Sequence, residues 1–217
     1  MTGRRTGDGR GADGRDGDLA LVAGPVDPLV AAEHPGLAVV SARVPFAPGP
    51  TPPEIRERLR RAADRWRGPQ AVALRTRPVP WAYRVLFRHL GLDPDVTRTP
   101  VEALVVERLV HGGVPVRGMP GDALALGTLE TGVALVALDA ARVSGTVGIA
   151  AGERIVLADA AGTVAPLFGP PAPAHAPGRR TRALVLVAVV APAVPALHVE
   201  EALWTAAAAL PTVDATS

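Results

Sequence analysis

The stretch TPVEALVVERLVHGG, residues 99–113, separates a part of the sequence that predicts mainly helices from a part that predicts mainly strands. Thr99 followed three residues later by Glu102 is a capping box that begins a helix, and Gly112-Gly113 ends that helix. The stretches before this segment predict mainly helices, whereas short apolar runs broken by Gly and Pro predict strands after it. Because the strands follow the helices instead of alternating with them, the sequence indicates an α+β fold.

Further elements are predicted from the spacing of apolar residues and from the Gly and Pro residues that interrupt it. Thr51 and Glu54 form a second capping box, and apolar residues at 3.6-residue spacing continue from it as far as Gly68-Pro69. Two more helices are predicted at Pro80–Leu90 and His198–Leu210. The predicted strands are Leu19–Ala23, Leu37–Val44, Ala71–Leu74, Val133–Ala137, Thr146–Ile149, Arg154–Leu157, Thr163–Leu167 and Arg182–Val190.

Length and composition favour one packed domain. The chain has 217 residues, of which 48% are hydrophobic and 20% charged, so it can bury a sizeable core. Residues 1–18 contain little besides Gly, Arg and Asp, which predicts a disordered tail before a single domain at residues 19–217. The absence of Cys excludes disulfides, thiolate zinc sites, iron–sulfur ligation and a Cys nucleophile.

The charge of the chain lies unevenly along the sequence. All 23 basic residues are Arg, and the net charge is only +2. Residues 54–108 hold 12 Arg and 7 acidic residues, a local excess of 5 positive charges. This half could meet a polyanion such as tRNA, or it could be an Arg-rich helical surface that water solvates.

Several kinds of site and location are excluded by missing patterns. With no Lys there is no phosphate-binding GxxxxGK[ST] loop, and the five His form no HxH or HxxxH pair, so we expect neither a metal nor an organic cofactor. The longest strongly apolar run, Ala183–Ala191, is too short to span a bilayer. We therefore expect a soluble cytoplasmic protein with no membrane partner.

A series of short motifs occurs in one order from residue 27 onward. They are Asp27 with Glu33-His34-Pro35-Gly36-Leu37, Ala82-Tyr83-Arg84, Gly91-Leu92-Asp93-Pro94, Arg98 with Pro100, Glu102-Ala103-Leu104, Arg108 and Gly121-Asp122. This order resembles the B3/B4 domain of the bacterial phenylalanyl-tRNA synthetase beta subunit. It is similar above all to freestanding proteins built from that domain alone.

The segment after Asp122 matches the spacing of the synthetase domain without a gap. The matching positions are Asp122, Glu130, Gly132, Leu135, Ala137 and Asp139. Three polar positions of the family are apolar here: its Thr-Asn pair falls on Leu124-Ala125, and its His falls on Val136. The framework is kept while these polar groups are replaced.

The resemblance implies a fold and an activity. The fold would be a compact, layered α+β unit with N-terminal helices and a mixed, sandwich-like β-sheet. In the synthetase this domain edits: it hydrolyses the ester of tRNA that carries Tyr in place of Phe, without a metal or an organic cofactor. An active form of this chain would be an aminoacyl-tRNA ester hydrolase and not a complete ligase.

The resemblance also supplies candidate site residues. Glu130 would contact the amine or a water as the catalytic carboxylate, and phosphates of the tRNA would meet exposed arginines. The other expected substrate-binding residues are Asp122, Gly132, Asp139, Arg108 and Glu102. The expected phosphate contacts are chosen by their place in the sequence: Arg84 and Arg88 lie on the helix that carries Tyr83, and Arg179, Arg180 and Arg182 flank the Pro-rich stretch Pro170–Gly178.

Each candidate has a structural alternative. Glu130 can be a solvent-exposed carboxylate at the end of a strand, and Asp122 and Asp139 can be turn formers that accept backbone N–H groups. Glu102 can serve as the capping partner of Thr99. The arginines can be surface residues without a ligand.

Two functions therefore remain open. The first is binding of tRNA or aminoacyl-tRNA, with editing of mischarged tRNA in trans as an option and no role for DNA. The second is a degenerate, non-catalytic B3/B4 module that binds a small amino acid-like ligand or a protein partner. The apolar residues at Leu124, Ala125 and Val136 favour the second function.

Overall fold

The computed structural model describes residues 19–211, so the tail expected at residues 1–18 lies outside the described range, as do residues 212–217. The strands are β1 (Leu21–Ala23), β2 (Ala38–Pro45), β3 (Ala134–Asp139), β4 (Gly148–Ala150), β5 (Val156–Asp159), β6 (Gly162–Pro166) and β7 (Ala183–Val190). The helices are α1 (Pro28–Glu33), α2 (Pro53–Asp64), α3 (Pro69–Ala73), α4 (Pro78–His89), α5 (Pro100–His111), α6 (Gly121–Thr131) and α7 (Ala196–Ala209), with a short 3-10 helix at Leu74–Thr76.

The strands form two antiparallel sheets, which confirms the α+β class. The larger sheet has the order β1-β2-β7-β3, and the smaller has the order β4-β5-β6. The mixed sheet implied by the family resemblance is wrong for residues 19–211, because every ladder between named strands in this range is antiparallel. A parallel contact occurs at the isolated bridge between Val26 and Ile149.

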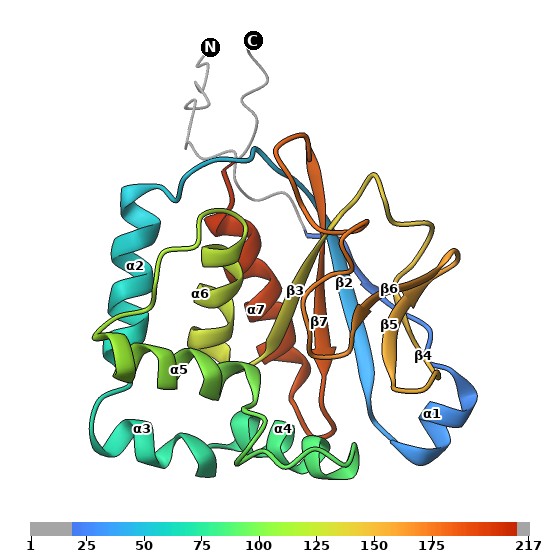
Figure 1. Ribbon diagram of the computed structural model, residues 1–217, viewed down its shortest axis with the longest axis horizontal. Coiled ribbons are helices and arrows are strands. Elements are labelled where there is room, and N and C mark those ends of the chain that lie inside the picture. The colour runs from blue at the N-terminus through green and yellow to red at the C-terminus, as the bar shows by residue number, and fades with distance from the viewer. Residues whose placement is uncertain (1–18, 212–217) are drawn as a thin grey trace, which may run out of the picture.

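The larger sheet lies between helices and the smaller sheet (Figure 1). Helices α6 and α7 pack against each other and against β3 and β7, while β4 contacts β2 from the other side. Because both faces are covered, β7 is buried from Leu184 to Val189. Gly127 permits this packing, since a Cβ there would lie 2.7 Å from Leu135 Cδ1 and 2.9 Å from the backbone oxygen of Ala202.

Helix α6 is the main departure from the sequence expectation, which placed strands and no helix between Gly113 and the helix predicted at His198–Leu210. Residues 121–131 are helical and almost entirely buried, because α2, α5, α7 and β3 surround them. A helix without a solvent face shows no amphipathic period, so its apolar residues resemble those of a buried strand. The strand expected at Ala71–Leu74 is likewise wrong, because α3 and the 3-10 helix occupy it.

The two predicted capping boxes have different outcomes. The capping box at Thr99 is confirmed, because the backbone N–H of Thr99 donates to Glu102 Oε2 over 3.2 Å. The box at Thr51 is wrong, because α2 begins at Pro53 without a side-chain cap. The Thr51 hydroxyl donates instead to Asp122, which is 71 residues away in the sequence and fully buried. A tertiary partner has replaced the local one.

Tyr83 fixes α4 against the larger sheet. Its hydroxyl donates to the backbone oxygen of Val189 and accepts from the backbone N–H of Ala134 at 3.0 Å. Burial raises the pKa of Tyr83, so the phenol stays protonated. The Tyr of the Ala82-Tyr83-Arg84 motif therefore joins the start of β3 to the end of β7.

Candidate functional site

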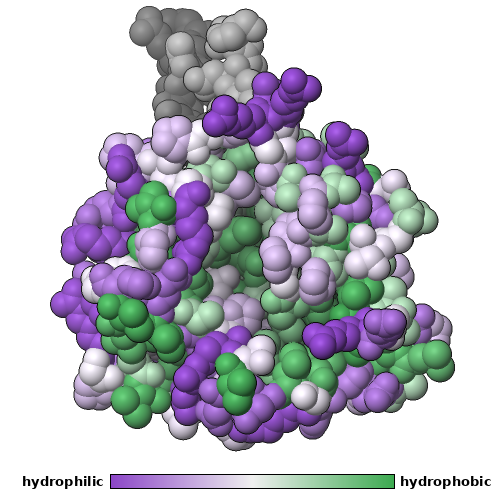
Figure 2. Space-filling model, viewed as in Figure 1, coloured by the Kyte–Doolittle hydropathy of each residue, from purple (hydrophilic) through white to green (hydrophobic). Residues whose placement is uncertain are grey.

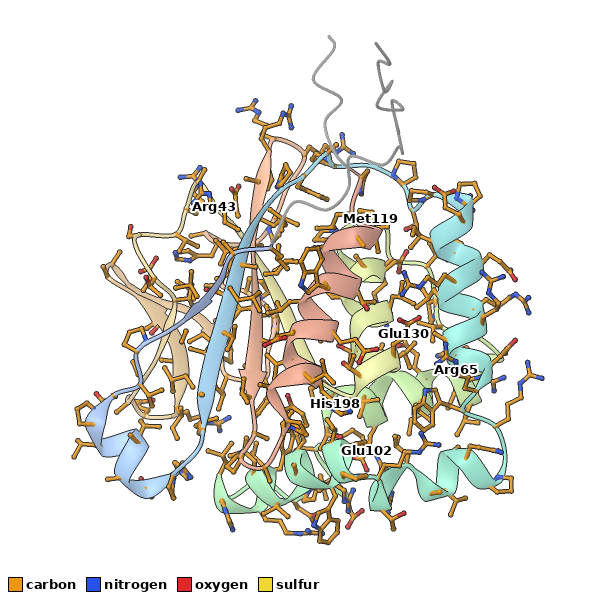
Figure 3. The ribbon with its side chains drawn as sticks, turned by 180° about the vertical axis from the view of Figure 1, so that it is seen from behind. Arg43, Arg65, Glu102, Met119, Glu130 and His198 are labelled. Atoms are coloured by element: carbon orange, nitrogen blue, oxygen red, sulfur yellow. The ribbon has the colours of Figure 1, made fainter. Side chains whose placement is uncertain are left out.

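The residues expected to form one site lie in separate regions of the molecule. Glu102 lies towards one end and Glu130 lies in the middle beside Arg65 (Figure 3). Towards the other end lies Met119, in the loop that the expected residue Asp122 binds. The structure therefore does not gather the candidate residues around one pocket.

Glu130 joins two helices. It occupies the last turn of α6, so the expected strand end is wrong, and its largely buried carboxylate accepts from Arg58 Nε at 3.2 Å and Nη2 at 2.7 Å. Arg65 Nη2 lies 3.9 Å away. Gly132 ends α6 with a φ of 85°, a left-handed C-cap. Both residues have structural roles here, and the geometry gives no support to catalysis by Glu130.

Glu102 and Arg84 belong to a buried ion-pair network. Arg84 Nη1 donates to Glu102 Oε1 over 2.7 Å, and Arg84 Nη2 donates to Asp95 Oδ1 over 2.8 Å. The hydrogen bond from Arg84 holds the pKa of Asp95 below its ordinary value. Glu102 also accepts from Thr99, so its capping role is confirmed. Because Arg84 is buried and bonded to acids, the expected phosphate contact at this residue is wrong.

Arg108 and Arg88, the other two expected site arginines on helices, lie in different surroundings. Arg108 is buried on α5, where its Nη2 donates to Asp64 of α2 over 3.1 Å. It therefore links α2 to α5 and is not placed to hold a substrate. Arg88 is exposed on the last turn of α4, and its guanidinium lies over the ring of Trp81 at 5.6 Å from the centroid.

Asp122 holds the loop that precedes α6. Its Oδ1 accepts from the backbone N–H of Arg117 at 2.9 Å, and its Oδ2 accepts from that of Gly118 at 3.1 Å. The hydroxyl of Thr51 also donates to it. This fully buried carboxylate has the turn-forming role that its sequence position allowed, and it fixes the loop around Met119.

Asp139 performs a similar task at the end of β3. Its Oδ1 accepts from the backbone N–H of Ala141 at 3.0 Å, and its Oδ2 accepts from the Thr181 hydroxyl at 2.8 Å. Its own backbone N–H donates to the oxygen of His175 over 2.8 Å. Asp139 thus ties the segment before β7 to the larger sheet.

Four exposed arginines gather at the end of the larger sheet that Asp122 and Asp139 organise. Arg179, Arg180 and Arg182 precede β7, and Arg43 lies on the neighbouring strand β2, three positions before Phe46, whose backbone N–H donates to the oxygen of Arg182. We call these four residues the arginine rim. Among residues 19–211, none of the four forms a salt bridge with an acidic side chain.

A pocket of about 550 Å³ adjoins the arginine rim. Hydrophilic side chains gather at this end of the molecule (Figure 2). The residues that line the pocket are Phe46, Pro48, Gly49, Met119, Pro177, Gly178 and Arg179. Sequence reasoning missed Arg43 and Met119. Arg43 carries a signal, because it is a charged residue in a strand of alternating pattern, which places it on the solvent side.

Most arginines of the Arg-rich segment 54–108 pair with acidic side chains. Arg60 and Arg61 pair with Glu57, and Arg67 pairs with Asp64. The further paired arginines of this segment are Arg58, Arg65, Arg75, Arg84 and Arg108. Few guanidinium groups of this segment are therefore left without an acidic partner among residues 19–211, and the solvated-helix interpretation fits α2.

The three family positions that are apolar here lie on α6 and β3. Ala125 is buried, whereas Leu124 and Val136 are partly exposed. Val136 points away from α6, because its neighbour Leu135 faces Gly127 of that helix and side chains alternate along a strand. The visible face of the molecule is hollowed at its middle, and the floor of the hollow is hydrophobic (Figure 2).

Three further findings complete the description. Within residues 19–211, no three His, Asp or Glu side chains are grouped as a metal ion would require. The same residues contain no helix of the length and apolar character that a bilayer crossing needs. In comparisons with known proteins, no family model, no curated protein and no solved structure matches this chain.

Proposed function

We propose that this chain is a B3/B4-like protein that binds tRNA or aminoacyl-tRNA, with the arginine rim as its contact to the RNA backbone. The observation that carries the proposal is the gathering of four exposed guanidinium groups beside a pocket, without acidic partners among the described residues. One guanidinium group can donate two parallel hydrogen bonds to two oxygens of the same phosphate. The resemblance to a tRNA-editing domain is the reason to choose RNA among polyanions.

The segment that carries three of these arginines is held in one conformation. The Thr181 hydroxyl accepts from the backbone N–H of Gly178 at 2.9 Å while it donates to Asp139. Arg182 Nη1 donates to the backbone oxygens of Thr181 and Arg179 at 3.1 and 3.3 Å. A turn that is already ordered loses less conformational entropy on binding, which favours a phosphate contact here.

Hydrolysis by Glu130 is not part of this proposal, because Arg58 occupies both oxygens of its carboxylate. A second candidate is a non-catalytic module that holds a small, apolar amino acid-like ligand. It is favoured by Leu124 and Val136, which are partly exposed apolar residues where the family has polar ones. Each of these side chains can contact an aliphatic group, but neither can form a hydrogen bond with a hydroxyl.

The test is tRNA binding measured against salt concentration. The logarithm of the association constant should fall linearly with the logarithm of salt concentration. The double variant Arg179→Gln/Arg180→Gln should lower that slope by about one unit for each phosphate group that the variant no longer binds. Arg154→Gln is the matched control, because Arg154 is exposed beside the smaller sheet and should leave the slope unchanged. Binding without a salt slope, or equal effects of both variants, would contradict the proposal.

A panel of correctly and incorrectly charged tRNAs separates binding from editing. We expect Glu130→Gln to hydrolyse every charged tRNA at the same rate as the wild-type protein. Loss of one hydrolytic activity in Glu130→Gln, with the far-UV circular dichroism unchanged, would assign catalysis to Glu130 after all. Binding of free amino acids without binding of tRNA would instead support the second candidate.

A further inference from the structure

Helix α5 is apolar on two opposite sides. Its inner side buries Val101 and Val105, whereas Val106, Leu109 and Val110 on its outer side are 39%, 50% and 71% exposed. A helix at the surface of a soluble protein normally carries polar residues towards the solvent, and an apolar character all round is typical of a covered helix. The outer side of α5 thus has the composition of an interface.

Helix α3 lies beside this outer side and completes a groove. The groove has a volume of about 460 Å³, and Val72 of α3, which is 78% exposed, faces it together with Val106 and Leu109. Hydrophobic side chains are gathered over the same two helices on the visible surface (Figure 2). A contiguous exposed apolar surface of this kind marks an interaction site.

The polar residues of the groove give it a positive charge. Arg75 and Arg98 both line it. Arg75 is paired with Asp95 at 2.9 Å, whereas Arg98 forms no salt bridge with an acidic side chain in residues 19–211. The acidic residue of the lining, Glu102, is buried and bonded to Arg84. The groove therefore favours an apolar side chain that is flanked by free carboxylates.

The chain itself carries such a group on the first turns of α7. Leu197 is 69% exposed, and Glu200 and Glu201 follow it at the i+3 and i+4 positions, on the same side of the helix. Both glutamates are exposed and form no salt bridge within residues 19–211. We propose that the groove between α3 and α5 receives Leu197, Glu200 and Glu201 from a second copy of this chain.

Symmetry determines the form of the assembly. If each copy both gives its Leu197 and receives that of its partner, the contact closes as a dimer; otherwise it continues from copy to copy. Either form buries the apolar side of α5, and either form makes the apparent mass depend on protein concentration. Sedimentation velocity over a wide range of concentrations measures this directly.

Substitutions at exposed positions test the contact without disturbing the core. We expect Leu197→Ser and Val106→Ser each to weaken self-association by about tenfold or more. Leu29→Ser is the matched control, because Leu29 on α1 is 75% exposed and lies on the other side of the molecule (Figure 1). It should leave the sedimentation profile unchanged.

A charge exchange identifies the partner surface. Arg98→Glu and Glu201→Arg should each weaken association, and the double variant should restore most of it, because the two charges then oppose each other again. A wild-type protein that stays monomeric at every concentration would overturn the proposal. Self-association that neither Leu197→Ser nor Val106→Ser weakens would overturn it as well.

Discussion

Asp122, Glu130 and Asp139 each connect parts of the chain that are distant in sequence. Asp122 accepts from Thr51, Glu130 from Arg58, and Asp139 from Thr181. A largely buried carboxylate is costly unless hydrogen bonds compensate for the lost hydration, and each of these three has them. Polar residues that match the motif positions of a catalytic family can therefore be needed for the stability of the fold and not for catalysis.

Tyr83 allows the most direct test at this scale. Tyr83→Phe keeps the ring, which packs edge-on against Phe168 at 6.1 Å, but removes the hydroxyl that serves Val189 and Ala134. Two buried backbone groups then lose a partner, so the free energy of unfolding should fall by about 1–3 kcal/mol. Urea denaturation measures this change. An unchanged midpoint and slope would show that the hydroxyl contributes nothing to stability.

At the scale of elements, helix α6 determines how the layers fit together. It begins at the loop that Asp122 holds, it ends at Gly132, and it is packed between α2, α7 and β3. Its N-terminal end carries Leu124 and Ala125, whereas its C-terminal end carries Glu130. The same helix thus separates the family's polar positions from the carboxylate that was expected to act with them.

Gly127→Ala tests the closeness of this packing through the sign of its effect. In an open helix this change would stabilise the protein by about 1 kcal/mol through helix propensity. Here the new Cβ would lie 2.9 Å from the backbone oxygen of Ala202, which cannot move without α7. We therefore expect a loss of about 1–3 kcal/mol in the free energy of unfolding. A gain measured by urea denaturation would mean that α6 and α7 are further apart.

For the molecule as a whole, charge and apolar surface lie at different places. The arginine rim is at the end of the larger sheet near Met119, whereas the groove between α3 and α5 is towards the other end, near Glu102 (Figure 3). The proposed binding of RNA and the proposed self-association would therefore use separate surfaces. Variants at Arg179 and Arg180 should leave sedimentation unchanged, and Leu197→Ser should leave the salt slope of RNA binding unchanged.

Stability at acid pH is a property of the whole set of paired carboxylates. Burial acts to raise the pKa of Asp159, but backbone N–H groups of Ser144, Ala161 and Gly162 donate to it and hold its pKa below the ordinary 3.8. The pKa of Asp64 is lowered by hydrogen bonds from Arg67 and then Arg108. Because these pKa values are lower in the folded than in the unfolded chain, the stabilisation is complete above pH 3.8 and is lost as the pH falls through the folded values.

Thermal unfolding measured from neutral pH downward should show this loss. The melting temperature should stay level well above pH 3.8 and decrease below it. Asp159→Asn, which no longer titrates, should start from a lower melting temperature and lose less of it on acidification. Equal acid sensitivity of the variant and the wild-type protein would contradict the role assigned to Asp159.

Local patterns in the sequence were enough to predict the α+β class, the helix that follows the Thr99–Glu102 capping box, and the strands around Leu37–Val44 and Arg182–Val190. These features depend on interactions within a few residues or on alternation along one strand, both of which are visible in a linear pattern. Motif order also selected Asp122 and Asp139, and their place beside a Pro-rich stretch selected the arginines before β7. All of these residues lie at one end of the larger sheet.

The partner of each polar group depends on the packing of distant segments and is visible only in the folded molecule. Thr51 bonds Asp122 instead of its own helix, Arg58 of α2 donates to Glu130 of α6, and Arg43 joins the arginine rim because β2 pairs with β7. The helical state of α6 was hidden for the same reason, since burial on all sides removes the amphipathic pattern. Contacts between residues about seventy positions apart depend on how the layers pack, and a local sequence pattern does not predict which distant residues will meet.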